Sequence, residues 1–201
     1  MTSEASRQRA DRAERFVLVA LLGLLAYRLV PDLAEQPVNL IYLVSETMVI
    51  LMVTFRRTAN DISRRSGDWV IGFAGTLLPL LVVRSDSAPL PYGATLLFVG
   101  FCIAVGAQLS LLRSFGVVAA NRGVRTGGLY SLVRHPMYLG YFFTHLGFLL
   151  TNPLLWNVAL CAVWTVCQLY RIHAEERVLW ADTAYVAFAR RVPYRLVPFV
   201  Y

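Results

Sequence analysis

Six long apolar runs, separated by polar segments, constrain the fold of this chain more than any other feature of its sequence. Hydrophobic residues make up 57% of the chain and charged residues only 15%, a balance that is too apolar for an ordinary soluble domain. We therefore predict an all-α fold, a polytopic integral membrane helical bundle with about six spans. In chain order the runs are Phe16–Val30, Val38–Phe55, Trp69–Val83, Tyr92–Leu112, His135–Leu150 and Leu154–Tyr170.

The basic residues predict how the bundle lies in the membrane. All 19 of them are arginine, and they cluster before the first, third and fifth apolar runs and after the sixth. The alternate loops carry almost none, so the positive-inside rule predicts that both termini and the segment before the fifth run are cytoplasmic. We expect an integral protein of a bacterial inner membrane. Topology explains the net charge of +7 better than nucleic-acid binding does, and we expect no nucleic-acid partner.

The chain shows no internal repeat and no sign of a second domain, so residues 1–201 are expected to form a single membrane domain. The N-terminal spans occupy residues 1–112, and the half that carries the chemistry occupies residues 113–201. Within this second half, a helical hairpin over residues 135–170 would turn at the short connection Thr151-Asn152-Pro153. Both ends of the hairpin then lie at the same face of the membrane.

A polar and basic stretch at the start of the fifth run is the predicted chemical centre of the chain. Pro136 suits the first position of a helix, where its fixed φ is favourable and no backbone donor is lost, so Arg134 and His135 would lie at the helix start. The unpaired N–H groups of a first helical turn carry partial positive charge, which together with these side chains suits a carboxylate or a phosphate. For His135 alone, a plain capping role is an open alternative.

A second polar patch follows the hairpin, on a helix expected to run from Arg171 to about Arg191. Arg171 and Glu175 are four residues apart and share a helix face, so they could form an ordinary ion pair or converge on one ligand. Glu176 would point elsewhere. The hairpin brings this patch near His135, and a carboxylate opposite a cationic helix start would form a bipolar pocket suited to a zwitterionic or sulfonium ligand.

Other kinds of site find no support in the sequence. The three histidines, His135, His145 and His173, share no metal-ligand spacing and no carboxylate cluster joins them, so we expect no metal. The glycines within the spans do not follow a strand, which argues against a dinucleotide-binding fingerprint. Glu46 lies in the middle of the second span, where structural pairing, protonation and a catalytic role all remain open.

Three sequence pieces, taken in order, resemble the isoprenylcysteine carboxyl methyltransferase family and its phospholipid methyltransferase relatives. The pieces are Gly127-Gly-Leu-Tyr130 through Arg134-His-Pro-Met-Tyr-Leu-Gly140, then Arg171-Ile-His-Ala-Glu-Glu-Arg-Val-Leu179, and then Arg191-Val-Pro193. The resemblance covers the chain from about Leu112 onward. It implies a small membrane enzyme that transfers a methyl group from S-adenosylmethionine, held in a cytoplasmic pocket beneath a lipid-accessible tunnel, without a metal or a Rossmann domain.

The resemblance also implies roles for individual residues. Arg171 would face the methyl acceptor, and Arg171 and Glu175 would be the catalytic residues. The acceptor would be a lipophilic or prenylcysteine-like molecule, with O-methylation of a carboxylate oriented by Arg171 as the favoured reaction. The C-terminal helix would complete the pocket. The cofactor would lie against Val124, Arg125, Tyr130, His135, Pro136, Met137, Tyr138 and Glu175.

Two alternatives belong to other functional classes. Arg134-His-Pro136, combined with the ending Val192–Tyr201, also resembles the C-terminal part of sterol reductases that use NADPH. This chain departs from their pattern, because Met137 and Tyr141 stand where those enzymes usually carry an asparagine and an acidic residue. The segment after Glu176 is in turn about two residues shorter than is usual in the methyltransferase family. A non-enzymatic membrane scaffold is the remaining alternative.

Overall fold

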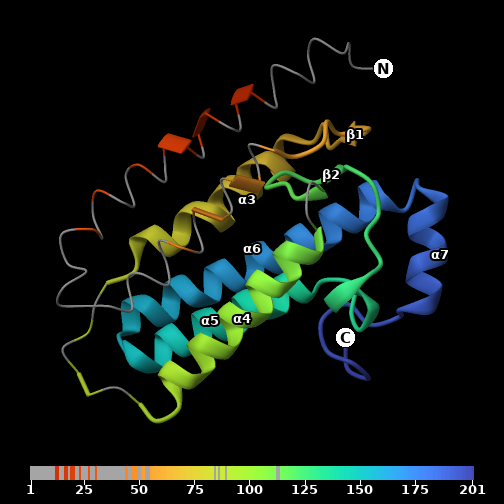
Figure 1. Cartoon of the computed structure of the whole chain (residues 1–201). Helices are drawn as coiled ribbons and strands as arrows, with labels where there is room; N and C mark the ends of the chain where they lie inside the picture. The colour runs from red at the N-terminus through yellow and green to blue at the C-terminus, as the bar shows by residue number, and fades with distance from the viewer. Residues whose placement is uncertain are drawn as a thin grey trace.

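The computed structural model describes residues 55–201, apart from residues 84, 86, 89, 112 and 113, together with isolated positions before residue 55. The first two expected spans fall almost entirely outside the described residues, and Glu46 lies outside them. The described helices are α3 (Ser66–Leu77), α4 (Gly93–Leu111), α5 (Pro136–Thr151), α6 (Leu155–Leu179) and α7 (Thr183–Arg191). Helices α4, α5 and α6 lie side by side, and α3 packs along α6 (Figure 1).

The third apolar run breaks at Pro79, as its sequence predicts. Helix α3 ends at Leu77 and is followed by the 3₁₀ segment η1 (Leu78–Leu81), in whose first turn Pro79 lies because it has no N–H to donate. The segment that follows η1 is hydrogen-bonded to the start of α6. The Asn157 side chain accepts from the Val83 N–H at 3.1 Å and donates to the Val83 carbonyl at 2.7 Å.

Closely packed glycines hold α4 and α5 together. A Cβ atom on Gly100 of α4, or on Gly140 or Gly147 of α5, would overlap backbone atoms of the facing helix. Small residues at such contacts let two helix backbones approach closely, which is a common mode of helix packing in membranes. The start of α5 is therefore held in a fixed register against α4.

Helices α5 and α6 form a helical hairpin, with its turn at the short connection that the sequence predicts. The backbone N–H of the C-cap residue Asn152 donates to the Phe148 carbonyl at 2.9 Å, which ends α5. The Asn157 side chain donates to the Asn152 carbonyl at 3.0 Å and so closes the turn from the α6 side. Because the hairpin is tight, the start of α5 and the polar end of α6 lie at the same end of the bundle.

The polar helix after the hairpin differs from the prediction. Helix α6 continues from its apolar part through Arg171 to Leu179, and α7 begins separately at Thr183. The expectation of one helix from Arg171 to Arg191 is wrong because Asp182 starts a new one: its carboxylate accepts the Ala184 N–H at 2.9 Å, which is an N-cap. Helix α7 lies across the end of the bundle (Figure 1).

The described fold is mostly helical, in line with the predicted all-α class, and it contains one short two-stranded ribbon. Strands β1 (Asp61–Ile62) and β2 (Ala120–Asn121) pair antiparallel. The Asn121 side chain donates to the Asp182 carboxylate at 2.8 Å, which ties the ribbon to the turn between α6 and α7. Strand β1 lies before α3, and β2 lies in the glycine-containing segment between α4 and α5, so two segments that are far apart in the chain form the ribbon.

Two of the described helices are long and apolar enough to cross a membrane, judged by length and composition. They are α4, with a mean hydropathy of 2.0, and α6, with a mean hydropathy of 1.2. Helix α5 has 16 residues and a length of about 24 Å, which is shorter than a bilayer core of about 30 Å. The total of six spans therefore stays a prediction.

Candidate functional site

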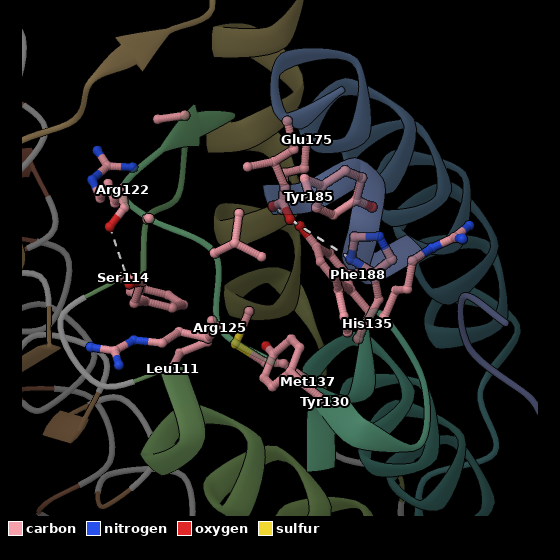
Figure 2. Close-up of a pocket in the computed structure, with 18 of the residues that line it drawn as sticks. Leu111, Ser114, Arg122, Arg125, Tyr130, His135, Met137, Glu175, Tyr185 and Phe188 are labelled. Carbon is pink, nitrogen blue, oxygen red and sulfur yellow. Dashed lines mark hydrogen bonds and ion pairs between the residues drawn. The ribbon is translucent and has the colours of Figure 1, made fainter. Parts of the chain in front are cut away.

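A cavity of about 90 Å³ lies at the end of the bundle that α7 covers. Its wall comes from the loop around β2, from the segment that leads into α5, and from α6 and α7. Figure 2 shows Arg122 and Ser114 on one side of the cavity and His135, Glu175 and Tyr185 on the other. The cavity therefore has a basic side and an acidic side, joined by aromatic and apolar residues.

Most residues predicted to bind a cofactor line this one cavity, although they come from three separate segments. Seven of the eight are in its wall: Val124, Arg125, Tyr130, His135, Met137, Tyr138 and Glu175. The eighth, Pro136, is buried at the first position of α5 and is not in the wall. Arg171, predicted to face the acceptor, is not in the wall either.

Glu175 is the acidic group of the cavity. The Tyr138 hydroxyl donates to its carboxylate, and Nδ1 of His135 lies 3.9 Å from its Oε2 atom. The rings of His135 and Tyr138 meet edge to face, with 5.7 Å between their centres. Glu175 is partly exposed, whereas His135 and Tyr138 are buried. These three side chains therefore form a preorganised acceptor for a cationic group that enters the cavity.

Tyr130 contributes a buried phenol to the same wall. Burial raises the pKa of Tyr130 well above its ordinary value, and the negative charge of Glu175 raises this pKa further. The phenol is consequently protonated at physiological pH and can donate a hydrogen bond. Its ring also offers a flat apolar face to a bound aromatic base.

Arg171 lies behind the cavity wall. Its Nη1 atom donates to the Gln168 side chain at 3.0 Å, and Nη2 donates to the Val117 carbonyl at 3.1 Å. The centre of the guanidinium lies 5.5 Å from the centre of the Tyr138 ring, a cation–π distance. In this arrangement Arg171 supports Tyr138 and the loop before β2, and it reaches the cavity through Tyr138.

Two backbone donors and one cationic side chain next to the start of α5 have protein partners. The N–H groups of Arg134 and His135 donate to the carbonyls of Tyr194 and Arg195, at 2.9 and 2.8 Å. The Arg134 side chain binds Glu176, with 2.9 Å between Nε and Oε1. These groups are therefore already occupied by protein partners, because the C-terminal segment folds back over the helix start.

Glu176 is the centre of a buried network that sequence reasoning missed. Its Oε1 atom accepts from Nε of Arg134 and from the Tyr185 hydroxyl at 3.1 Å, and lies 3.3 Å from Nε2 of His135. Its Oε2 atom accepts from Nε of Arg195 at 2.8 Å. Glu175 lines the cavity, whereas Glu176 does not. The arginine and tyrosine partners lie 9, 19 and 42 residues from Glu176 in the chain, so the spacing of neighbours on one helix does not indicate them.

Arg122 is a second residue that the sequence reasoning passed over. It lies directly after β2, is buried, and lines the cavity. Its guanidinium packs against Gly116, where a Cβ atom would overlap it. The Ser114 hydroxyl donates to the Arg122 carbonyl at 3.2 Å and holds the loop closed. Gly116 is the sequence feature that could have indicated this contact, because a residue without a side chain lets the Arg122 guanidinium approach its backbone closely.

Comparison with known proteins gives a match to one family over part of the chain and a similar solved structure. Residues 92–182 match the phospholipid methyltransferase family. A search of curated proteins gave no match. One similar solved structure is that of the eukaryotic intramembrane Ras methyltransferase ICMT, an isoprenylcysteine carboxyl methyltransferase, without a monobody. It shares 21% sequence identity with this chain, covers 92% of this chain and 76% of its own, and has a TM-score of 0.49.

The family match includes α4, the loop around β2, the start of α5, the hairpin and the polar end of α6. It thus contains all the predicted cofactor residues and Arg171. The predicted resemblance is confirmed, and residues 92–182 of this chain carry the sequence pattern of the phospholipid methyltransferase family.

Proposed function

We propose that this protein is an S-adenosylmethionine-dependent methyltransferase of the membrane that acts on a lipophilic or prenylcysteine-like acceptor. One observation carries the proposal. Seven residues that the sequence assigns to the cofactor, from three separate segments, line one cavity. Six of them lie within residues 124–138, and the hairpin adds the seventh, Glu175, from a distant part of the chain.

The residues of the cavity fit the chemical groups of this cofactor. Glu175 offers a carboxylate to the ammonium group of the methionine part. Arg122 and Arg125 lie where they can pair with its carboxylate, and Tyr130, Tyr185 and Phe188 supply aromatic surface for the adenine. This assignment uses both the acidic and the basic side of the cavity.

When bound, S-adenosylmethionine would supply a methyl group already activated by its positively charged sulfur. The chain then has to align the acceptor in line with the bond that breaks and keep water out. Tyr138 is held by Glu175 and by the Arg171 guanidinium, so its ring has a fixed position at the wall. We propose that Arg171 orients the acceptor side of the site through this contact, with carboxylate O-methylation as the favoured reaction.

Ligand binding provides the first test. Purified protein in detergent should show a higher melting temperature with S-adenosylhomocysteine, and little change with NADPH, because only a ligand that binds the folded state stabilises it. The reverse pattern would favour the sterol-reductase alternative. No response to either ligand would favour a membrane scaffold and overturn the proposal.

Activity provides the second test and addresses the acceptor. Protein supplied with cofactor carrying a labelled methyl group should transfer the label to one of three acceptors: a lipid extract, a prenylcysteine analogue or a small thiol panel. Transfer to the prenylcysteine analogue that is reversed by mild base would indicate a methyl ester. Transfer only to an amine of the lipid extract would contradict carboxylate O-methylation while leaving methyl transfer itself in place.

A further inference from the structure

His135 lies between two carboxylates with different surroundings. Its Nδ1 atom is 3.9 Å from Oε2 of Glu175, which lines the cavity, and its Nε2 atom is 3.3 Å from Oε1 of Glu176, which does not. His135 is 4% exposed and Glu176 is 2% exposed. One edge of the imidazole ring therefore faces the ligand cavity and the opposite edge faces the buried network.

Glu176 is held in place independently of His135. Two guanidinium groups and one phenol donate to it, from Arg134 at 2.9 Å, Arg195 at 2.8 Å and Tyr185 at 3.1 Å. Two cationic donors favour the ionised carboxylate, which can only accept hydrogen bonds. The backbone of His135 is fixed as well, since its N–H donates to the Arg195 carbonyl at 2.8 Å.

These contacts determine which edge of the ring can carry the proton. A neutral imidazole has one N–H and one lone pair, and the nitrogen that faces an ionised carboxylate is the better place for the N–H. Both nitrogens of His135 face a carboxylate, but only Nε2 lies at hydrogen-bond distance, 3.3 Å from Glu176 against 3.9 Å between Nδ1 and Glu175, so the N–H belongs on Nε2 and the lone pair on Nδ1. A lone pair on Nδ1, beside the Glu175 carboxylate, creates a cavity edge that accepts hydrogen bonds from two adjacent groups.

We propose that Glu176 is a positioning residue for the ligand site: it holds the Nε2–H of His135 and thereby presents the Nδ1 lone pair to the cavity. The ligand group that this edge recognises is a hydrogen-bond donor, such as an ammonium group. The inference rests on the proposed function only for the identity of that ligand. The tautomer of His135 is a property of the protein alone.

Nitrogen NMR of ¹⁵N-histidine-labelled protein tests the tautomer directly. The chain has three histidines, and the signal that is absent from His135→Gln is assigned to His135. In the native protein, we expect the single proton of the neutral ring on Nε2. A proton on Nδ1, alone or together with Nε2, would overturn the proposal, and this measurement needs no variant of Glu176.

The Glu176→Gln variant tests whether the charge of Glu176 is what holds the proton of His135 on Nε2. Glutamine keeps the size of the side chain but removes the charge, so a measurable share of His135 should move its proton to Nδ1. Asp182→Asn is the matched control, because it also replaces a carboxylate by its amide, but the hydrogen bonds of Asp182 are with Asn121 and the Ala184 N–H, so the His135 signal should be unchanged. An unchanged signal in Glu176→Gln, in protein that retains its melting transition, would mean that Glu176 has only a structural role.

Ligand affinity separates this proposal from the proposed function. Glu176→Gln should bind S-adenosylhomocysteine about tenfold more weakly, the effect expected for weakening one hydrogen bond to a charged group. A changed tautomer without any ligand binding in the native protein would refute the proposed function and leave the positioning role in place. Native binding with an unchanged tautomer in Glu176→Gln would refute the positioning role alone.

Discussion

The guanidinium of Arg171 lies 5.5 Å from the centre of the Tyr138 ring, and the hydroxyl of the same ring donates to Glu175. A residue outside the cavity wall is thus joined to the acidic group of the cavity through one aromatic side chain. A substitution of Arg171 is therefore expected to act on the cavity through Tyr138, and not by removing a group of the cavity wall.

Arg171→Lys should reduce turnover and stability while leaving the dissociation constant of S-adenosylhomocysteine little changed. Lysine cannot reproduce the planar contact with Tyr138 and the two hydrogen bonds to Gln168 and Val117 together. Losing such bonds at a buried site costs about 1–3 kcal/mol of unfolding free energy. Exposed Arg190→Lys is the control. If Arg171→Lys weakened ligand binding as much as Glu175→Gln does, Arg171 would belong to the cofactor site.

Glu175→Gln should weaken binding of S-adenosylhomocysteine by about tenfold or more, because the ammonium group loses a charge-assisted hydrogen bond. Glutamine can still accept from the Tyr138 hydroxyl, so the cavity wall should keep its shape. Asp182→Asn removes a carboxylate that is not in the wall, and it should bind the ligand normally. Isothermal titration in detergent measures the dissociation constant of each variant. If Glu175→Gln bound the ligand as tightly as the native protein does, Glu175 would not belong to the site.

Gly140→Ala should destabilise the protein, whereas Gly127→Ala should not. A Cβ atom at position 140 would overlap the backbone of α4, but at position 127 it would meet no atom within 4 Å. Overpacking of this kind costs about 1–3 kcal/mol. The melting temperatures of the two variants in detergent give the comparison. Equal melting temperatures would contradict the close α4–α5 contact.

The contribution of Asp182 to stability should disappear in acid. Hydrogen bonds from the Asn121 side chain and the Ala184 N–H lower the pKa of Asp182 below its ordinary value. A group whose folded-state pKa is depressed stabilises the protein above its unfolded pKa, which is about 3.9, and loses that contribution as the pH falls through the folded pKa. At pH 7 the native protein should therefore have a higher melting temperature than Asp182→Asn. This difference in melting temperature should shrink and disappear as the pH falls below about 3.9. A constant difference would show that the charge of Asp182 is not involved.

Both termini should lie in the cytoplasm. The expectation follows from the arginine clusters, which fall on alternate sides of the six apolar runs. Fusions of a reporter that is active only in the cytoplasm, made at each terminus, should both be active. A periplasmic result at either terminus would contradict the six-span arrangement.

Sequence reasoning was most successful where the signal was local. The long apolar runs gave the positions of α4, α5 and α6, and Pro136 marked the first residue of α5. The predicted cofactor residues came from motif pieces rather than from physical pattern. Their meeting in one cavity agrees with the hairpin, since a tight hairpin necessarily brings its two ends to the same place.

Sequence reasoning failed where partners are far apart in the chain. Asp182, which caps α7 locally through the Ala184 N–H, also binds Asn121, which is 61 residues away in the chain. Arg134 was expected to attract an anionic ligand, but the anion that it binds is the protein's own Glu176. In each case a charged side chain had several candidate partners, and spacing could not choose among them.

Apolar runs, proline and short-range spacing predicted α4, the α5–α6 hairpin and the types of side chain available to the site. The packing of segments that are distant in the chain sets which charged side chains face the cavity and which pair with other charged side chains in the buried network. A charged side chain pairs with whatever partner the fold brings within about 3 Å, and that partner can lie anywhere in the chain. Adjacent Glu175 and Glu176 consequently have opposite surroundings, one in the cavity wall and one among buried arginines.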